Sequence, residues 1–568
     1  MSKSRFIREY LTSLKEDKEL DYIFPLLLEA MNFRVVTTPL CSKGQSQYGK
    51  DVVAIGKAED GLIYRWYFEL KGNAAKDIND TTFMEPDGVR ESILAAKDVP
   101  FKESGIPYFD NLPVKIVFVH NGILQENTRP QYEGFIAREF PNGGFERWGI
   151  EKLVNLFGTY MFDESMLYDA ESYKLIMKIL LQCEAPGWSA DNLRMLIQRL
   201  CSQCKVERKR EVVRTLAALK LVLTMILDSS REAKNLLPAK ESSDVIVLLT
   251  WAWILRNNLE TKQYVIESFN GMAEYHLSIY VEYLQKILPL AKKLKGLHMR
   301  GGEMERVFYP MRCYDFLADL LYFYYAVKRR NSKEMIGIMQ EEAMHVIEVN
   351  SGFDVMTLDT QSIPLLMLMR FLFIPQCSEE TTGKFVEYMG RVLGNLLRRY
   401  RQQHMFPELY GNRIACAKSL YGKSDDYEDK SSLLLVVILE IITWFGFDAW
   451  YDHLRKAIVE SKVNLQVAYP IPDDELEIHL FEHRLMSEMC VETSIQLPET
   501  LEEFKKSFVK KYDHMPLRTE KVGYGFLTVL AHKYYRTDMF PDFLNLGFVK
   551  PLKEEKVKSY ENTRSKQI

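Results

Sequence analysis

The chain has 568 residues, 47% of them hydrophobic, and its 74 Lys and Arg residues are nearly balanced by 78 Asp and Glu. This composition excludes a disordered chain, and the length predicts several globular domains rather than a single core. The net charge of −4 excludes a global basic field that would attract nucleic acid by itself.

The first predicted elements are a helix at residues 24–30 and a strand at residues 34–37. Two further apolar runs, residues 52–55 and 63–68, are rich in β-branched and aromatic residues. Gly61, in the short polar segment between them, can adopt the positive φ that a tight turn requires. These two runs therefore predict a β-hairpin.

The register of this hairpin determines where three charged side chains lie. A turn centred on Asp60 sets Asp51 opposite Glu69, with Cβ atoms about 5 Å apart. Because strand side chains alternate between faces, Glu69 and Lys71 project from the same side. Two carboxylates and one ammonium group are therefore expected to meet at one sheet edge.

This trio predicts metal-dependent chemistry. Two close carboxylates repel each other unless a cation lies between them, and oxygen ligands favour a hard cation, Mg²⁺ or Mn²⁺. Lys71 would help to deprotonate an attacking water or hold a phosphate oxygen in the transition state. The implied reaction is hydrolysis of a phosphodiester bond.

The spacing Glu-x-Lys alone is weak support, because it recurs at Glu16/Lys18, Glu207/Lys209, Glu503/Lys505 and Glu554/Lys556. The strand context and Asp51 distinguish Glu69 and Lys71 from these repeats. Two alternatives stay open. Glu69 and Lys71 could be a solvated pair of charges on the edge of a hairpin, or the domain could be a degenerate nuclease fold that is kept for binding and has no catalytic activity.

The next predicted elements are a helix at residues 88–97, a strand at 114–120, a helix at 130–140 and a strand at 145–148. This order, with the charged trio, resembles the PD-(D/E)xK or restriction endonuclease-like superfamily, and within it the Mrr-like branch, over residues 1–157. The chain departs from the family pattern in having Lys50 where a Pro precedes the first acid.

The resemblance implies an N-terminal α/β nuclease domain at residues 1–160. Asp51 and Glu69 would be metal ligands for Mg²⁺ or Mn²⁺, Lys71 the catalytic lysine, and Glu29 an accessory acid on the first helix. Gln47 falls near a position that is often polar in such enzymes.

From about residue 165 the apolar spacing becomes helical, which predicts an all-α module at residues 161–550 with sub-boundaries near 185 and 470. The charged segment 551–568 is poor in large apolar residues and is expected to be disordered. The predicted helices include residues 172–182, 212–228, 244–256, 272–288, 314–327, 383–401 and 431–450.

Residues 431–450 are long enough to span a membrane, but Glu440 lies in the middle, which favours a buried helix. Basic clusters at residues 205–214, 328–330 and 398–401 could contact phosphates or be solvated helix faces. His479 and His483 spell the HxxEH of inverted zinc proteases, but their neighbours alternate as in a strand, which argues against that site.

Together these patterns predict an α+β multidomain protein: a metal-dependent DNA endonuclease domain followed by a large helical module for regulation, oligomerisation or docking of a protein partner. By analogy with fused Mrr-like enzymes, we expect double-stranded DNA as substrate and a role in bacterial defence against phage or plasmids. No signal peptide or disulfide framework is recognised, which favours the cytoplasm. The alternative is a non-catalytic helical interaction protein with a degenerate nuclease-fold domain.

Overall fold

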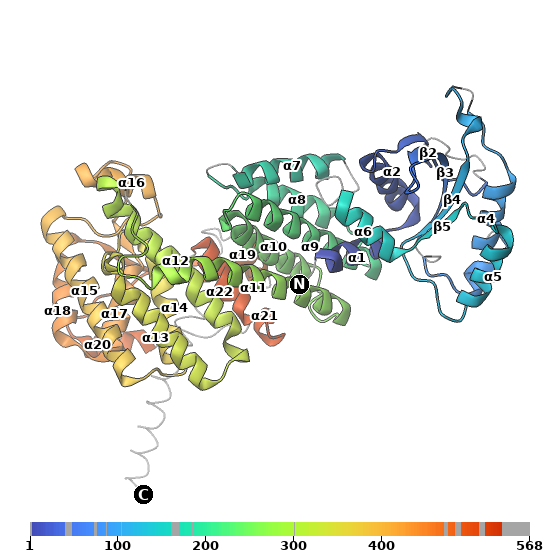
Figure 1. Cartoon of the computed structure of the whole chain (residues 1–568). Helices are drawn as coiled ribbons and strands as arrows, with labels where there is room; N and C mark the ends of the chain where they lie inside the picture. Colours follow the sequence, from blue (N-terminus) through green and yellow to red (C-terminus); the bar gives the residue numbers. More distant parts are fainter. Residues whose placement is uncertain are drawn as a thin grey trace, which may run out of the picture. The chain divides into compact units, whose positions relative to one another are not determined.

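The computed structural model describes most of the chain, which divides into two compact units (Figure 1). The first comprises Met1–Thr250 and Leu259–Ile279, and the second Trp251–Asn258 and Tyr280–Ile568. The described residues are 3–39, 48–72, 76–86, 88–103, 105–160, 170–184, 187–299, 301–470, 475–482, 490–509 and 517–536. Gln47, His483 and the segment 551–568 lie outside them.

The first unit contains a five-stranded sheet in the order β1-β2-β3-β4-β5. The first three strands pair antiparallel and the last two join in parallel, each through a helical crossover. The strands are β1 (Arg34–Thr37), β2 (Val52–Lys57), β3 (Ile63–Lys71), β4 (Val114–His120) and β5 (Phe145–Trp148). The predicted order of strands and helices is confirmed.

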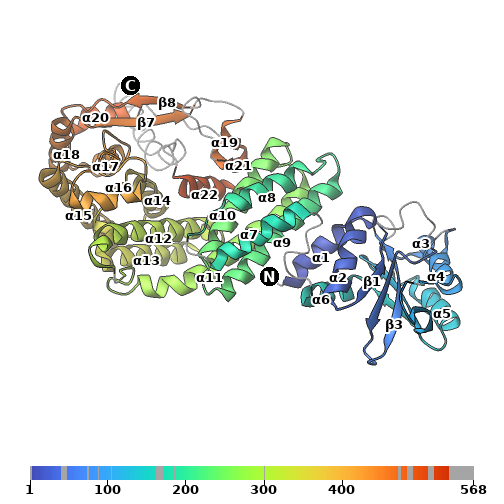
Figure 2. The ribbon, with the colours of Figure 1, turned by 90° about the horizontal axis from the view of Figure 1, so that it is seen from above.

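Helices cover both faces of this sheet (Figure 2). On one face, rings of Phe24, Phe68 and Trp148 pack edge to face, with centroids 5.2 to 6.1 Å apart. On the other, Ile93 and Phe135 pack against Phe118 of β4. The first face carries α1 (Lys3–Ser13), α2 (Asp21–Ala30) and α6 (Ile150–Tyr160), and the second α4 (Val89–Asp98) and α5 (Arg129–Glu139).

The predicted hairpin register is confirmed. Val52 pairs with Phe68 and Lys57 with Ile63, and Gly61 in the connecting turn has a φ of 84°. A residue with a Cβ atom adopts such a φ only at a cost, which is why glycine fits this turn. The next pair beyond Val52 and Phe68 brings Asp51 opposite Glu69.

Helices continue the first unit beyond the sheet domain. They are α7 (Ala170–Glu184), α8 (Asp191–Ser202), α9 (Lys209–Glu232), and parts of α10 (Leu237–Arg256) and α11 (Gln263–Ala291). The predicted boundary at residue 160 falls between α6 and α7, inside this compact unit. The physical reason is that the long, largely buried α9 packs against α1 as well as against α7.

The second unit is mainly helical, and its helices include α12 (Glu305–Val327), α13 (Lys333–Val349), α14 (Ser362–Phe373), α15 (Glu379–Gln403), α17 (Leu434–Phe445), α18 (Asp448–Ser461) and α22 (Gly525–Tyr535). It also contains a small sheet of β6 (Ser431–Ser432), β7 (Asn464–Pro470) and β8 (Cys490–Ser494). The all-α expectation was therefore wrong here, because residues 464–470 alternate apolar and polar residues with the period of a strand.

The single helix predicted at residues 431–450 is divided. Gly446, with a φ of 72°, ends α17, and its N–H bonds the carbonyls of Ile442 and Thr443. Residues 434–443 are all buried, including Glu440. In the described part of the chain, no helix is long and apolar enough to cross a membrane.

The strand predicted around residues 476–480 is instead the short helix α19 (Leu476–Glu482). Alternation misled because Glu477 is buried like its apolar neighbours. Its carboxylate accepts the backbone N–H groups of Arg518 and Thr519, at 2.8 and 2.7 Å. A contact with residues distant in the chain, which the local sequence pattern does not reveal, therefore explains why Glu477 is buried.

Candidate active site

The end of β3 and the start of β2 bring Asp51, Glu69 and Lys71 together. Asp51 Oδ2 accepts the backbone N–H of Leu70 at 2.7 Å, which ties the two strands beyond their last ladder pair. Lys71 Nζ lies 2.9 Å from Glu69 Oε1, and the Glu69 side chain is only 5% exposed. The predicted trio is thus one contiguous cluster at the sheet edge.

Burial sets the protonation of Asp51. It raises the pKa of this carboxyl group to about 8, and the neighbouring charge of Glu69 acts in the same direction. The Leu70 N–H and the Lys71 ammonium oppose the shift without cancelling it. In the absence of a cation, the two carboxyl groups therefore hold a proton near neutral pH, as expected for like charges in one site.

Lys71 remains an ammonium group. Burial acts to lower its pKa, but the carboxylates of Glu69, Glu16 and Asp51 outweigh burial and raise the pKa above the ordinary value. A permanent cation can hold a phosphate oxygen, whereas it cannot accept a proton from water. Of the two roles predicted for Lys71, this environment supports electrostatic stabilisation.

Glu16 is a neighbour of the site that sequence reasoning did not assign. Its Oε1 atom lies 3.8 Å from Lys71 Nζ, and its Oε2 atom accepts the N–H of Gly72 at 3.0 Å. Glu16 begins a π-helical turn, Glu16–Leu20, between α1 and α2. Sequence offers no local signal for this role, because the contact depends on how that turn meets β3.

Glu29, predicted as the accessory acid, is exposed at the end of α2. Among the described residues, its carboxylate forms no hydrogen bond or ion pair with Asp51, Glu69 or Lys71. Its role stays a prediction.

Lys50 occupies the position before Asp51 and anchors it. Its Nζ atom donates to the carbonyls of Tyr48 and of Ala95 in α4, at 3.0 and 3.3 Å, and lies 5.4 Å from the centroid of the Tyr67 ring. Burial lowers the pKa of Lys50 to about 8, opposed by the charge of Glu69. Lys50 thus fixes the entry to β2 where the resemblance implies a rigid Pro.

The donor set fits a hard divalent cation. Two carboxyl groups that share a proton can exchange that proton for Mg²⁺ or Mn²⁺, and the cation relieves the repulsion between them. Within the described residues there is no group of three or more His, Cys, Asp or Glu arranged around one metal. Asp51 and Glu69 would therefore supply two ligands and leave the others to water and substrate, as Mg²⁺ commonly requires.

Helix α9 holds the segment that carries Glu16. Arg214 forms a buried ion pair with Glu19, and Glu211 lies 3.1 Å from Lys15. Arg210 donates to the carbonyls of Ser13 and Leu14. These contacts flank Glu16 on both sides.

The contacts of α9 also locate the basic cluster at residues 205–214. Arg210 and Arg214 face the N-terminal segment, whereas Arg208 and Lys209 are exposed. Only the exposed members of this cluster remain accessible to phosphates.

Comparison with models of protein families, with curated proteins and with solved structures gave no match.

Proposed function

We propose that the first unit is a metal-dependent nuclease that hydrolyses phosphodiester bonds, acting as an endonuclease on double-stranded DNA. The observation that carries this proposal is the meeting of Asp51, Glu69 and Lys71 at the end of β3. The restriction endonuclease-like resemblance of residues 1–157 rests on the same three residues and on the order of helices and strands around them. It also supports the setting that we propose, defence against phage or plasmid DNA in a bacterial cytoplasm.

Each residue has a distinct part in the proposed reaction. Asp51 and Glu69 would hold Mg²⁺ or Mn²⁺, which when bound supplies a Lewis acid for the phosphate and an activated water. Lys71 holds a fixed positive charge beside the carboxylates, where it can stabilise negative charge that develops on the phosphate. Glu16 and the Leu70 N–H orient Lys71 and Asp51, respectively.

The helical region is proposed to serve regulation, oligomerisation or docking of a partner protein. Support comes from the charge of the chain, because a protein without a global basic field binds DNA weakly unless other surfaces contribute. The exposed Arg208 and Lys209 are candidates for such a contribution within the first unit.

The decisive experiment uses the full chain with supercoiled plasmid, linear duplex DNA and RNA, each with Mg²⁺, Mn²⁺ or EDTA. We expect nicking or linearisation of plasmid that EDTA abolishes and that Glu69→Gln lacks. If the wild-type protein binds DNA but cleaves none of these substrates, the non-catalytic alternative replaces this proposal. If the protein cleaves RNA alone, the proposed phosphodiester hydrolysis would stand, but double-stranded DNA would not be the substrate.

A further inference from the structure

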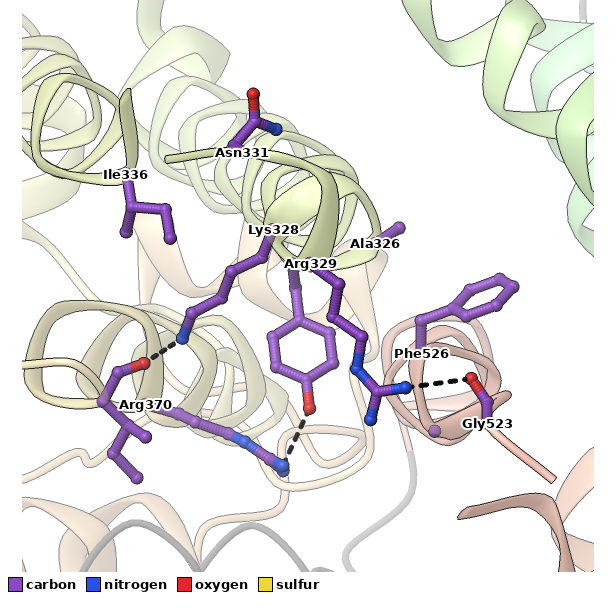
Figure 3. A pocket seen from close by; sticks show the side chains of 11 residues that line it. Ala326, Lys328, Arg329, Asn331, Ile336, Arg370, Gly523 and Phe526 are labelled. Atoms are coloured by element: carbon purple, nitrogen blue, oxygen red, sulfur yellow. Dashed lines mark hydrogen bonds between the residues drawn. The ribbon is translucent and has the colours of Figure 1, made fainter. Parts of the chain in front are cut away.

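The second unit contains a cavity of about 550 Å³ that the proposed nuclease chemistry does not use (Figure 3). It lies where the end of α12, the short 3₁₀ helix Lys328–Arg330, the end of α14 and the start of α22 meet. Its volume is within the range of cavities that bind small molecules and cofactors. The residues that matter here are Tyr325, Lys328, Arg329, Arg370, Ile374 and Phe526.

Three cationic side chains reach this cavity, Lys328 and Arg329 from the 3₁₀ helix and Arg370 from α14, and hydrogen bonds hold each of them (Figure 3). Arg370 Nη2 donates to the Tyr325 hydroxyl at 2.8 Å, and its guanidinium carbon lies 5.0 Å from the centroid of that ring. Lys328 Nζ donates to the carbonyl of Ile374. Arg329 Nη1 lies 3.5 Å from the carbonyl of Gly523.

No acidic side chain is among the described residues that line the cavity. Burial, together with the positive charge of Arg370, lowers the pKa of Lys328 to about 8. The positive charges of Lys328 and Arg370 repel each other in this half-buried cavity. An anionic ligand would relieve the repulsion, so the cavity favours one. Guanidinium groups match phosphate in particular, because their N–H groups can bond two phosphate oxygens at once.

The walls of the cavity are apolar and aromatic as well as cationic. Ile336 and Ile374 line it beside Phe526, and the Tyr325 ring lies against Arg370. Inorganic phosphate needs only the cations, whereas a base with a planar face gains from stacking on aromatic or guanidinium groups. The combination matches a ligand that carries both phosphate and a planar base.

We propose that this cavity is a nucleotide-binding site, in which Lys328, Arg329 and Arg370 bind the phosphates and the aromatic wall receives the base. The proposal is independent of the nuclease function, because the cavity lies wholly within the second unit.

The test is calorimetric titration of the full chain with ATP, GTP, AMP, adenosine and inorganic phosphate, in EDTA. We expect at least one of the three nucleotides to bind at least tenfold more tightly than adenosine or phosphate. Arg329→Ala should weaken its binding about tenfold, because it removes one phosphate contact. Lys333→Ala is the matched control: Lys333 is exposed, near in sequence and outside the cavity, so it should bind as the wild type does.

The proposal would be overturned by an absence of nucleotide binding at millimolar concentration, by phosphate binding as tight as that of nucleotide, or by equal weakening in Lys333→Ala. Glu69→Gln should bind nucleotide normally; loss of binding there would move the nucleotide to the nuclease site and refute the cavity. Because Arg329 is exposed, its removal should leave the fold intact, and circular dichroism serves as confirmation.

Discussion

Glu16 and Lys71 meet at the edge of the sheet, with the carboxylate 3.8 Å from the ammonium group and bonded also to the N–H of Gly72. The residues around Glu16 are fixed by α9 through the pairs Glu19–Arg214 and Lys15–Glu211. A helix outside the sheet domain therefore holds the segment that positions the proposed catalytic lysine.

Replacing Glu16 by Gln should lower the pKa of Lys71, because the Glu16 carboxylate is one of the charges that raise it. Gln can still accept the Gly72 N–H, so the fold should persist. We expect cleavage to fall about tenfold, the scale of one lost interaction of about 1.4 kcal/mol. NMR titration of ¹³C-labelled lysine measures the pKa shift, which a purely structural role would not produce. If Glu29→Gln slows cleavage and Glu16→Gln does not, the accessory acid is Glu29.

Glu69→Gln should abolish metal-dependent cleavage and leave the fold intact, because it removes one ligand charge and keeps the shape of the side chain. The matched control is Glu59→Gln, which changes an exposed acid in the turn of the same hairpin. Plasmid nicking assays and circular dichroism measure the two effects. Full activity in Glu69→Gln would place the reaction elsewhere in the protein.

Lys71→Ala should preserve metal binding and slow cleavage by about 10²-fold or more, the scale of one preorganised electrostatic contact. Both carboxylates remain, and they lose a competing cation, so Mn²⁺ affinity should not fall. Calorimetry with Mn²⁺ and single-turnover cleavage separate the two quantities. Loss of metal affinity together with activity would instead make Lys71 a structural residue.

The pKa of Asp51 predicts how stability depends on pH when no metal is present. Because folding raises this pKa from 3.8 to about 8, the folded state favours the protonated carboxyl group. The stability it contributes is complete below about pH 4 and is lost as the pH rises through about 8. Thermal unfolding in EDTA should show this loss, and Asp51→Asn should remove it. An unchanged pH dependence in Asp51→Asn would mean that another group titrates.

Sequence was sufficient for the hairpin and its charged trio, because a glycine turn fixes the register locally. The same kind of signal was present at Gly446, which ends α17, but continuous hydrophobicity on both sides obscured it. Glu16 and Glu477 were beyond local reasoning, because each is explained by a partner distant in the chain. The spacing of apolar residues and the residues in turns therefore predict strands and their registers. The positions of buried acidic residues, in contrast, depend on tertiary contacts.

The ion pair between Glu19 and Arg214 is buried, with side chains 10% and 9% exposed. Breaking this pair should therefore lower the stability of the first unit. Arg214→Met leaves a buried carboxylate without this partner and should destabilise the first unit by about 3–5 kcal/mol. Restoring neutrality with Glu19→Gln in the same chain should recover part of the loss. Hydrogen exchange at β3 amides reports on this unit alone.

The control is Lys174→Met, which breaks an exposed pair with Glu171 and should cost less than about 1 kcal/mol. If Arg214→Met also slows cleavage under conditions where the first unit remains folded, α9 acts on the site through the Glu16 segment. If cleavage by the folded protein is unchanged, the contact between α9 and this segment is structural only. The regulation of Lys71 by the helical region would then have to act by another route.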